Sequence, residues 1–195
     1  MRCCLAPVRA VDLAPRSSKI TTARWSPLNQ TILAGHEDGE IAHYSLDNAK
    51  LTSVKEHTAT IMDIQFAPDQ TYFITSSKDT SSKLFDTDSL RHLKTYQTDR
   101  PVNSASIAPD RDHVLVGGGQ EAMQVTTSSL RAGKFEVRVF HKVMSEEIGR
   151  IKGHFGPINT VHFHPSGRGF SSGGEDGYVR MHTFDEDYFN FKVEY

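Results

Sequence analysis

The chain has few of the features that mark secreted, membrane-bound or nucleic-acid-binding proteins. Its 195 residues include only two cysteines, the adjacent Cys3 and Cys4. No disulfide framework is therefore expected, and the reducing cytoplasm is the predicted compartment. No segment approaches the roughly 20 consecutive apolar residues that a membrane-spanning helix needs. The formal net charge of -2 gives no overall attraction to nucleic acid or anionic lipid.

A repeat with a period near 41 residues runs through most of the chain. An aliphatic residue stands seven positions before each of four prolines, and the pairs are Ile20 and Pro27, Ile61 and Pro68, Val102 and Pro109, and Ile158 and Pro165. Eleven residues after three of these prolines stand Asp38, Asp79 and Asp176. Two of these aspartates begin Asp-Gly, a strong hairpin signal because glycine accepts positive φ. Alternating apolar segments on both sides of each proline read as strands.

The third repeat carries an insertion. Its third strand, Phe135 to His141, begins fourteen residues later than the register of the other repeats requires. The distance from His141 to His154 then returns to nearly the usual length. The extra residues therefore belong to the connection between the second and third strands, between about Gly117 and Gly133.

Four strands per unit at this period are typical of β-propeller blades, so the fold class is predicted to be all-β. The predicted blades cover approximately residues 19–57, 58–98, 99–154 and 155–195. Each blade has two faces to bury and needs a neighbour on each side. Residues 1–18 match no repeat and are predicted to be a separate disordered leader.

Short motifs resemble the WD-repeat family. Gly153-His154 is similar to the Gly-His of these repeats, and Phe85-Asp86 is similar to their Trp-Asp. In that family a buried His, Ser/Thr, Asp and Trp tetrad of hydrogen bonds locks a blade. The resemblance implies two structural tetrads, one made by His57, Thr75, Asp79 and Phe85, the other by His154, Ser172, Asp176 and His182. Phe85 and His182 stand where the family has Trp.

A more specific resemblance covers about residues 19–195. The stretches Gly117 to Met123 (GGGQEAM) and Gly153 to Asn159 (GHFGPIN) are similar to the family of i subunits of eukaryotic translation initiation factor 3. That family folds as a seven-bladed propeller, so four blades imply a partial chain resembling its C-terminal portion. Two interpretations follow, a truncated product, which we favour, and a genuine short form. A four-bladed arc with seven-bladed curvature cannot close and leaves strand edges unpaired.

The resemblance also implies a function. The chain is expected to be a cytoplasmic, non-catalytic scaffold that binds the b and g subunits of initiation factor 3. Through them it would support recruitment of mRNA to the small ribosomal subunit, with no membrane and no small-molecule substrate involved. The alternative is a WD-repeat adaptor in another signalling or RNA-processing complex. A propeller enzyme such as a phytase or glycosidase needs clustered carboxylates or metal ligands, and the sequence shows none.

Three features that suggest chemistry have simpler explanations. Gly117, Gly118 and Gly119 are not followed by the Lys-Ser/Thr of a phosphate-binding loop. His162 and His164 share one face of a strand, but zinc requires three or four ligands and the tetrad already uses His154. The acidic run 185–187 is expected to lie in a solvated loop between strands. No catalytic, cofactor or metal site is therefore predicted.

The remaining candidates are surface residues that bind a partner. Asp69, Asp86 and Asp110 are predicted to lie on one rim, where they would receive a basic segment, because rim charges tune partner choice and association rate. The alternative is that these aspartates only form turns. Gln120 belongs to the inserted loop, which is predicted to lie on the opposite rim beside Gly153–Pro157. Long loops in compact domains are often functional.

Overall fold

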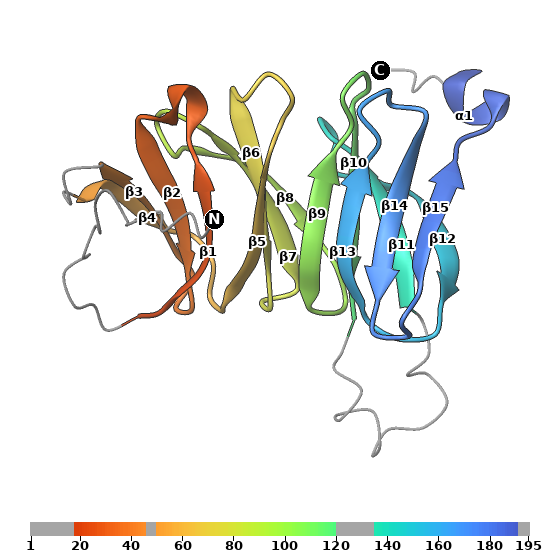
Figure 1. Cartoon of the computed structure of the whole chain (residues 1–195), viewed down its shortest axis with the longest axis horizontal. Helices are drawn as coiled ribbons and strands as arrows, with labels where there is room; N and C mark the ends of the chain where they lie inside the picture. The colour runs from red at the N-terminus through yellow and green to blue at the C-terminus, as the bar shows by residue number, and fades with distance from the viewer. Residues whose placement is uncertain (1–17, 46–49, 120–134, 191–195) are drawn as a thin grey trace, which may run out of the picture.

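The structure, a computed structural model, describes residues 18–45, 50–119 and 135–190. These residues form fifteen strands in four antiparallel sheets (Figure 1), which confirms the expectation of an all-β fold. The sheets are numbered 1 to 4 in chain order. Two short helices, η1 (Pro27–Asn29) and α1 (Glu186–Asn190), complete the described elements. Neither has the length and apolar character needed to cross a membrane.

Consecutive strands pair as a meander in every sheet. Sheet 1 consists of β1 (Ile20–Trp25), β2 (Thr31–His36), β3 (Glu40–Ser45) and β4 (Lys50–Lys55). Sheet 2 consists of β5 (Ile61–Phe66), β6 (Tyr72–Ser77), β7 (Ser81–Asp86) and β8 (His92–Gln97). Sheet 3 consists of β9 (Val102–Ile107), β10 (His113–Gly118), β11 (Phe135–His141) and β12 (Glu147–His154). Sheet 4 consists of β13 (Ile158–Phe163), β14 (Gly169–Gly174) and β15 (Val179–Thr183).

The hairpins between second and third strands form where the sequence places its turn aspartates. Gly39 and Gly177 follow Asp38 and Asp176 and adopt φ of 87° and 78°, a conformation that glycine reaches without steric cost. Each aspartate also accepts a hydrogen bond from the backbone N–H two residues later. The turn chemistry predicted for sheets 1 and 4 is therefore present.

In sheet 3 the corresponding connection runs from the end of β10 at Gly118 to the start of β11 at Phe135. The extra residues thus follow the second strand, as the shifted register predicts. Most of this connection, including Gln120, lies outside the described residues.

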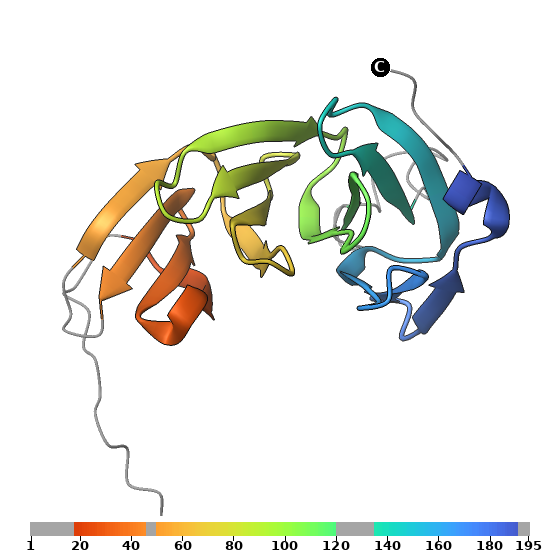
Figure 2. The same ribbon diagram turned by 90° about the horizontal axis from the view of Figure 1, so that it is seen from above.

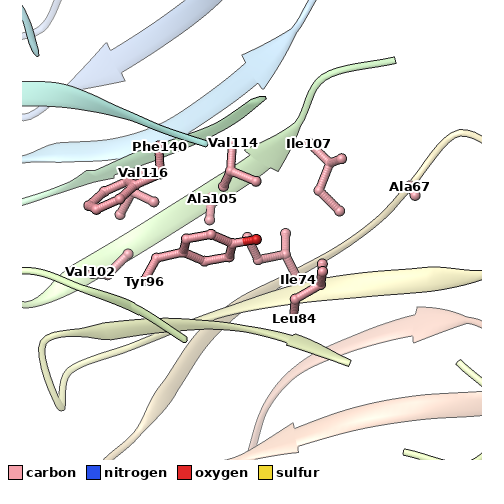
Figure 3. Packing of buried hydrophobic residues seen from close by; sticks show 10 residues of the cluster. All are labelled: Ala67, Ile74, Leu84, Tyr96, Val102, Ala105, Ile107, Val114, Val116 and Phe140. Atoms are coloured by element: carbon pink, nitrogen blue, oxygen red, sulfur yellow. The ribbon is translucent and has the colours of Figure 1, made fainter. Parts of the chain in front are cut away.

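The four sheets stack face to face in a curved row, with the first strand of each sheet on the concave side (Figure 2). An apolar cluster fills each of the three interfaces. Between sheets 2 and 3 it contains ten buried residues, among them Ile74, Leu84, Tyr96, Val102 and Phe140 (Figure 3). Since side chains from both sheets interdigitate there, each sheet depends on its neighbour for its core.

The acidic run Asp185, Glu186, Asp187 is exposed as expected, but only Asp185 lies in a loop. Glu186 and Asp187 begin α1, and Asp185 Oδ1 accepts a hydrogen bond from the backbone N–H of Tyr188 at 2.9 Å. The Tyr188 ring stacks on Phe184 with 3.8 Å between centroids. Its hydroxyl lies 2.6 Å from His113 Nδ1. Contacts with a residue 75 positions away thus support this single turn of helix.

Candidate interaction surface and the networks that support it

A histidine-centred network joins β6 of sheet 2 to two loops, the connection from β4 to β5 and the hairpin from β6 to β7. His57 lies in the connection from β4 to β5, and its Nδ1 is 2.8 Å from Asp79 Oδ2. Its Nε2 is 2.7 Å from the Thr75 hydroxyl on β6. The His57 side chain is fully buried and that of Asp79 is 9% exposed. The network thus ties the segment leading into sheet 2 to the hairpin between β6 and β7.

Chemistry fixes the direction of one of these hydrogen bonds. A carboxylate can only accept, so His57 Nδ1–H donates to Asp79. The Thr75 hydroxyl lies between His57 Nε2 and the Lys83 carbonyl, at 2.7 and 3.2 Å. Phe85 has no N–H to extend the chain of hydrogen bonds as Trp would. Its buried ring instead stacks on Phe73, with 5.4 Å between centroids.

Sheet 4 repeats the network with different residues. His154 Nδ1 lies 3.0 Å from both carboxylate oxygens of Asp176, and Nε2 lies 2.9 Å from the Ser172 hydroxyl. His182 does not join it, because no hydrogen bond links it to Ser172 among the described residues. Its ring stacks on Phe170 at 4.5 Å. The structure thus brings together three of the four residues in each predicted tetrad by hydrogen bonds.

Both aspartates of these networks are held in the ionised form. Burial opposes this for Asp79, but hydrogen bonds from His57, Ser81 and the Thr58 backbone outweigh burial and lower its pKa. For Asp176 burial is likewise outweighed, by the backbone N–H of Phe155 and by His154, and the pKa falls to about 2.

The lowered pKa values predict a loss of stability in acid. A carboxylate whose pKa is lower in the folded state stabilises the fold fully above its unfolded pKa, about 4, and loses that contribution as pH falls through the folded value. We expect the free energy of unfolding to decline between about pH 4 and the folded Asp176 pKa of about 2. Urea titrations across this range would measure it. Asp79→Asn should be less stable at pH 7 and show a shallower decline; an unchanged slope would contradict this assignment.

In their described residues, sheets 1 and 3 do not form this network of His, Ser or Thr, and Asp. In sheet 1 His36 on β2 is fully buried, and its Nε2 lies 3.1 Å from the Tyr44 hydroxyl on β3. In sheet 3 the position equivalent to Thr75 is Val116, which is buried among apolar side chains. The sequence predicts that these repeats lack most of the tetrad, and it does not reveal the pair made by His36 and Tyr44.

One group of potential metal ligands occurs within the described ranges. His36, Asp38 and Glu40 can bring one ligand atom each within 4.8 Å of one another. However, Asp38 Oδ2 already pairs with Lys55 Nζ at 3.3 Å, and Asp38 Oδ1 accepts from the Ser18 hydroxyl at 2.8 Å. The charge of Asp38 is thus already balanced by Lys55, without a metal ion. His162 and His164 are not part of any such group in the described chain.

The rim that carries the ends of β5 and β7 presents two of the predicted aspartates. Asp69 is exposed in the turn from β5 to β6, and Asp86 ends β7 opposite Tyr72. Both cap turns, because Asp69 accepts from Thr71 and Asp86 accepts from Ser89. The hydroxyl and backbone N–H of Ser89 hold the pKa of Asp86 below its usual value. The turn-forming role is therefore real and leaves exposed charge on this rim.

Sheet 3 continues the rim with charges of both signs. Asp110 is exposed in the turn from β9 to β10 and packs against Gly167 of sheet 4, where a Cβ would meet its carboxylate at 2.3 Å. Lys142 Nζ lies 2.8 Å from Asp112 and 3.1 Å from the Tyr72 hydroxyl. This rim is therefore a mixed surface, with exposed aspartates on sheets 2 and 3 and a lysine that pairs with Asp112 on sheet 3, which the sequence alone does not predict.

Comparison with known proteins identifies the family. The family model EIF3I matches residues 6–194. The chain belongs to the family of eukaryotic translation initiation factor 3 subunit I. It is 61% identical over 180 residues to the Nematostella vectensis protein of that name, 60% over 178 residues to the Xenopus laevis protein and 59% over 178 residues to the human one. The alignments cover 91–92% of this chain and 55–56% of those relatives, so the chain spans about half of their length.

In this member of the subunit I family, the rim opposite Asp69 and Asp86 carries a group of exposed aromatic residues that the sequence analysis does not predict. Phe155 is 82% exposed and Tyr178 is 60% exposed. The Arg180 guanidinium lies between them, 5.9 Å from the Phe155 ring centroid and 5.2 Å from that of Tyr178. The signal in the sequence was an aromatic residue directly after Gly153-His154 and another directly after Asp176-Gly177.

Proposed function

We propose that the chain is a non-catalytic, cytoplasmic scaffold of the initiation factor 3 complex, built as an arc of β-propeller blades. Family membership supports the role in translation initiation. The curved row of meander sheets, each with its first strand on the concave side, supports the propeller (Figure 2). The partners implied by the resemblance are the b and g subunits, through which the small ribosomal subunit and mRNA would be reached.

The observation that carries the docking proposal is the acidic part of the rim on sheet 2. Asp69 is exposed there, and Asp86 keeps a lowered pKa and hence its charge at neutral pH. They lie on adjoining strand ends, held by short turn hydrogen bonds, so the charges are fixed in place before a partner arrives. A basic face on the C-terminal helix of the b subunit fits such a surface, because complementary rim charges guide association.

Reversing these charges is expected to weaken binding of the C-terminal segment of the b subunit. The Asp69→Lys/Asp86→Lys double variant should raise the Kd about tenfold, with a larger effect at low salt. Isothermal titration calorimetry of the purified chain measures it. Asp69→Asn/Asp86→Asn keeps a side-chain oxygen to accept the turn hydrogen bonds while removing the charge. It separates electrostatics from turn geometry and should give an intermediate Kd.

A matched control reverses two acidic residues elsewhere. Glu37 and Glu175 are exposed in the hairpins at the other rim, and Glu37→Lys/Glu175→Lys makes the same change in net charge. This control should bind as the unmodified chain does. Equal weakening by both double variants would show a general charge effect, and full binding by the Asp69/Asp86 variant would refute the docking site.

A further inference from the structure

A lysine lies at the corner where the rim of sheet 2 meets sheet 3, between the two inner sheets of the row. Lys142 stands in the turn from β11 to β12, and its side chain is 19% exposed. Its amine lies 3.1 Å from the hydroxyl of Tyr72 and 5.2 Å from the centroid of that ring. Tyr72 begins β6 and pairs with Asp86, the last residue of β7. A cation of sheet 3 is therefore held one side chain away from a docking aspartate of sheet 2.

The strand register turns Asp86 toward this corner. Directly opposed residues of an antiparallel pair project to the same face of a sheet, as do alternate residues along each strand. Ile74 and Leu84 form one such pair, and both are buried in the core shared with sheet 3. Tyr72 and Asp86 are the next pair on that face. An unbalanced charge on Lys142 would therefore act on Asp86 across the corner.

Asp112, in the turn from β9 to β10, balances that charge. Its Oδ1 lies 2.8 Å from Lys142 Nζ, and its backbone carbonyl accepts from the backbone N–H of Lys142 at 2.6 Å. The hydrogen bond from Lys142 lowers the pKa of Asp112. Burial opposes the charge of Lys142, but the hydrogen bonds to Asp112 and Tyr72 outweigh burial and raise its pKa. Both groups are thus charged at neutral pH, and together they add no net charge to the rim.

The neighbouring sheets join the same two turns without an ion pair. In sheet 2 the backbone N–H of Thr87 donates to the carbonyl of Thr71 at 3.0 Å. In sheet 4 the backbone N–H of Phe184 donates to the carbonyl of Arg168 at 3.0 Å. The backbone bond is therefore a property of the repeat, whereas threonine and phenylalanine side chains cannot form an ion pair. The acid and the lysine are an addition in sheet 3, the sheet that borders the docking aspartates.

We infer that Asp112 is a specificity-determining residue of the docking surface, which by pairing with Lys142 keeps this rim selective for a basic partner segment. The local potential of a rim guides an approaching partner. An unbalanced lysine at the corner would repel a basic segment and favour acidic competitors, and specificity is the difference between such affinities. The inference rests on the proposed docking of the b subunit. It adds a positioning residue that acts through Lys142 and need not touch the partner.

Association kinetics with a fluorescently labelled C-terminal segment of the b subunit test this role. Asp112→Asn keeps the shape of the side chain and leaves the Lys142 charge unbalanced. It should lower the association rate about threefold with little change in the dissociation rate, because rim charges act on encounter, and the effect should grow at low salt. Asp112→Asn/Lys142→Met should restore the rate. Asp112→Asn/Lys94→Met has the same net charge but removes an exposed lysine of β8, so it should stay slow.

The pattern of rescue decides the outcome. Rescue by Lys142→Met alone supports the inference and also shows that Asp112→Asn leaves the fold intact. An unchanged rate in Asp112→Asn, equal rescue by both lysine substitutions, or rescue by neither would overturn it, the last because Asp112 would then act on the partner or the fold directly. Failure of the unmodified chain to bind the segment would refute the docking proposal itself, and with it this inference. Binding that Asp112→Asn leaves unaffected would refute this inference alone.

Discussion

Replacing His57 with alanine is expected to lower the free energy of unfolding by about 3 kcal/mol, because a buried hydrogen-bond partner of a carboxylate is removed and a cavity is left. The imidazole supplies one side-chain donor to the buried Asp79 carboxylate and a hydrogen-bond partner for the Thr75 hydroxyl. After truncation, Asp79 keeps the N–H of Thr58 and the Ser81 hydroxyl, which only partly replace the lost partner. A cavity beside Phe85 adds to the cost.

Urea-induced unfolding followed by circular dichroism measures this loss. His164→Ala is the matched control, because His164 is exposed and, within the described part of the chain, its ring bonds to Ser166 two residues away. The control should change stability by no more than about 0.5 kcal/mol. A His57→Ala variant as stable as the control would show that the network is not a structural lock, and would remove the basis for the tetrad in sheet 2.

The parts of the fold that the sequence predicts well depend on local pattern. Alternation places the strands, and Asp-Gly fixes two hairpins because glycine alone reaches their positive φ without cost. The spacing of 22 residues from His57 to Asp79, repeated from His154 to Asp176, predicts two networks whose atoms meet within 3.0 Å. In these cases the residues that interact are also the residues that carry the repeat.

The parts that the sequence does not predict depend on distant contacts. Helix α1 is too short to form by propensity, and the hydrogen bond between Tyr188 and His113 that supports it spans 75 residues. His182 occupies the position of the WD tryptophan, yet its ring is used to stack on Phe170 of the neighbouring strand. The mixed charge of the rim results from Lys142, in the turn between β11 and β12, meeting Asp112, from which the insertion separates it by many residues.

Replacing Tyr96, in the interface between sheets 2 and 3, should also lower the free energy of unfolding strongly. This one side chain both fills the interface and forms a hydrogen bond across it. Tyr96 on β8 is fully buried among Ile74, Leu84, Val102 and Phe140 (Figure 3), and its hydroxyl donates to the Lys142 carbonyl at 2.8 Å. Burial raises the pKa of this hydroxyl, so it retains the proton that it donates. Tyr96→Ala is expected to cost about 4 kcal/mol, as for other buried aromatic residues.

Tyr96→Phe divides that cost into packing and hydrogen bonding. It keeps the ring and its contact with Phe140, at 5.7 Å between centroids, and removes only the hydroxyl. The expected loss is about 1 kcal/mol, the usual net value of one hydrogen bond. Because the sheets share this core, Tyr96→Ala should also unfold sheets 2 and 3 together, seen as loss of amide-exchange protection in β9 and β10 as well as in β7 and β8. Protection retained in sheet 3 would mean that each sheet is stable by itself, contrary to the shared core that joins them.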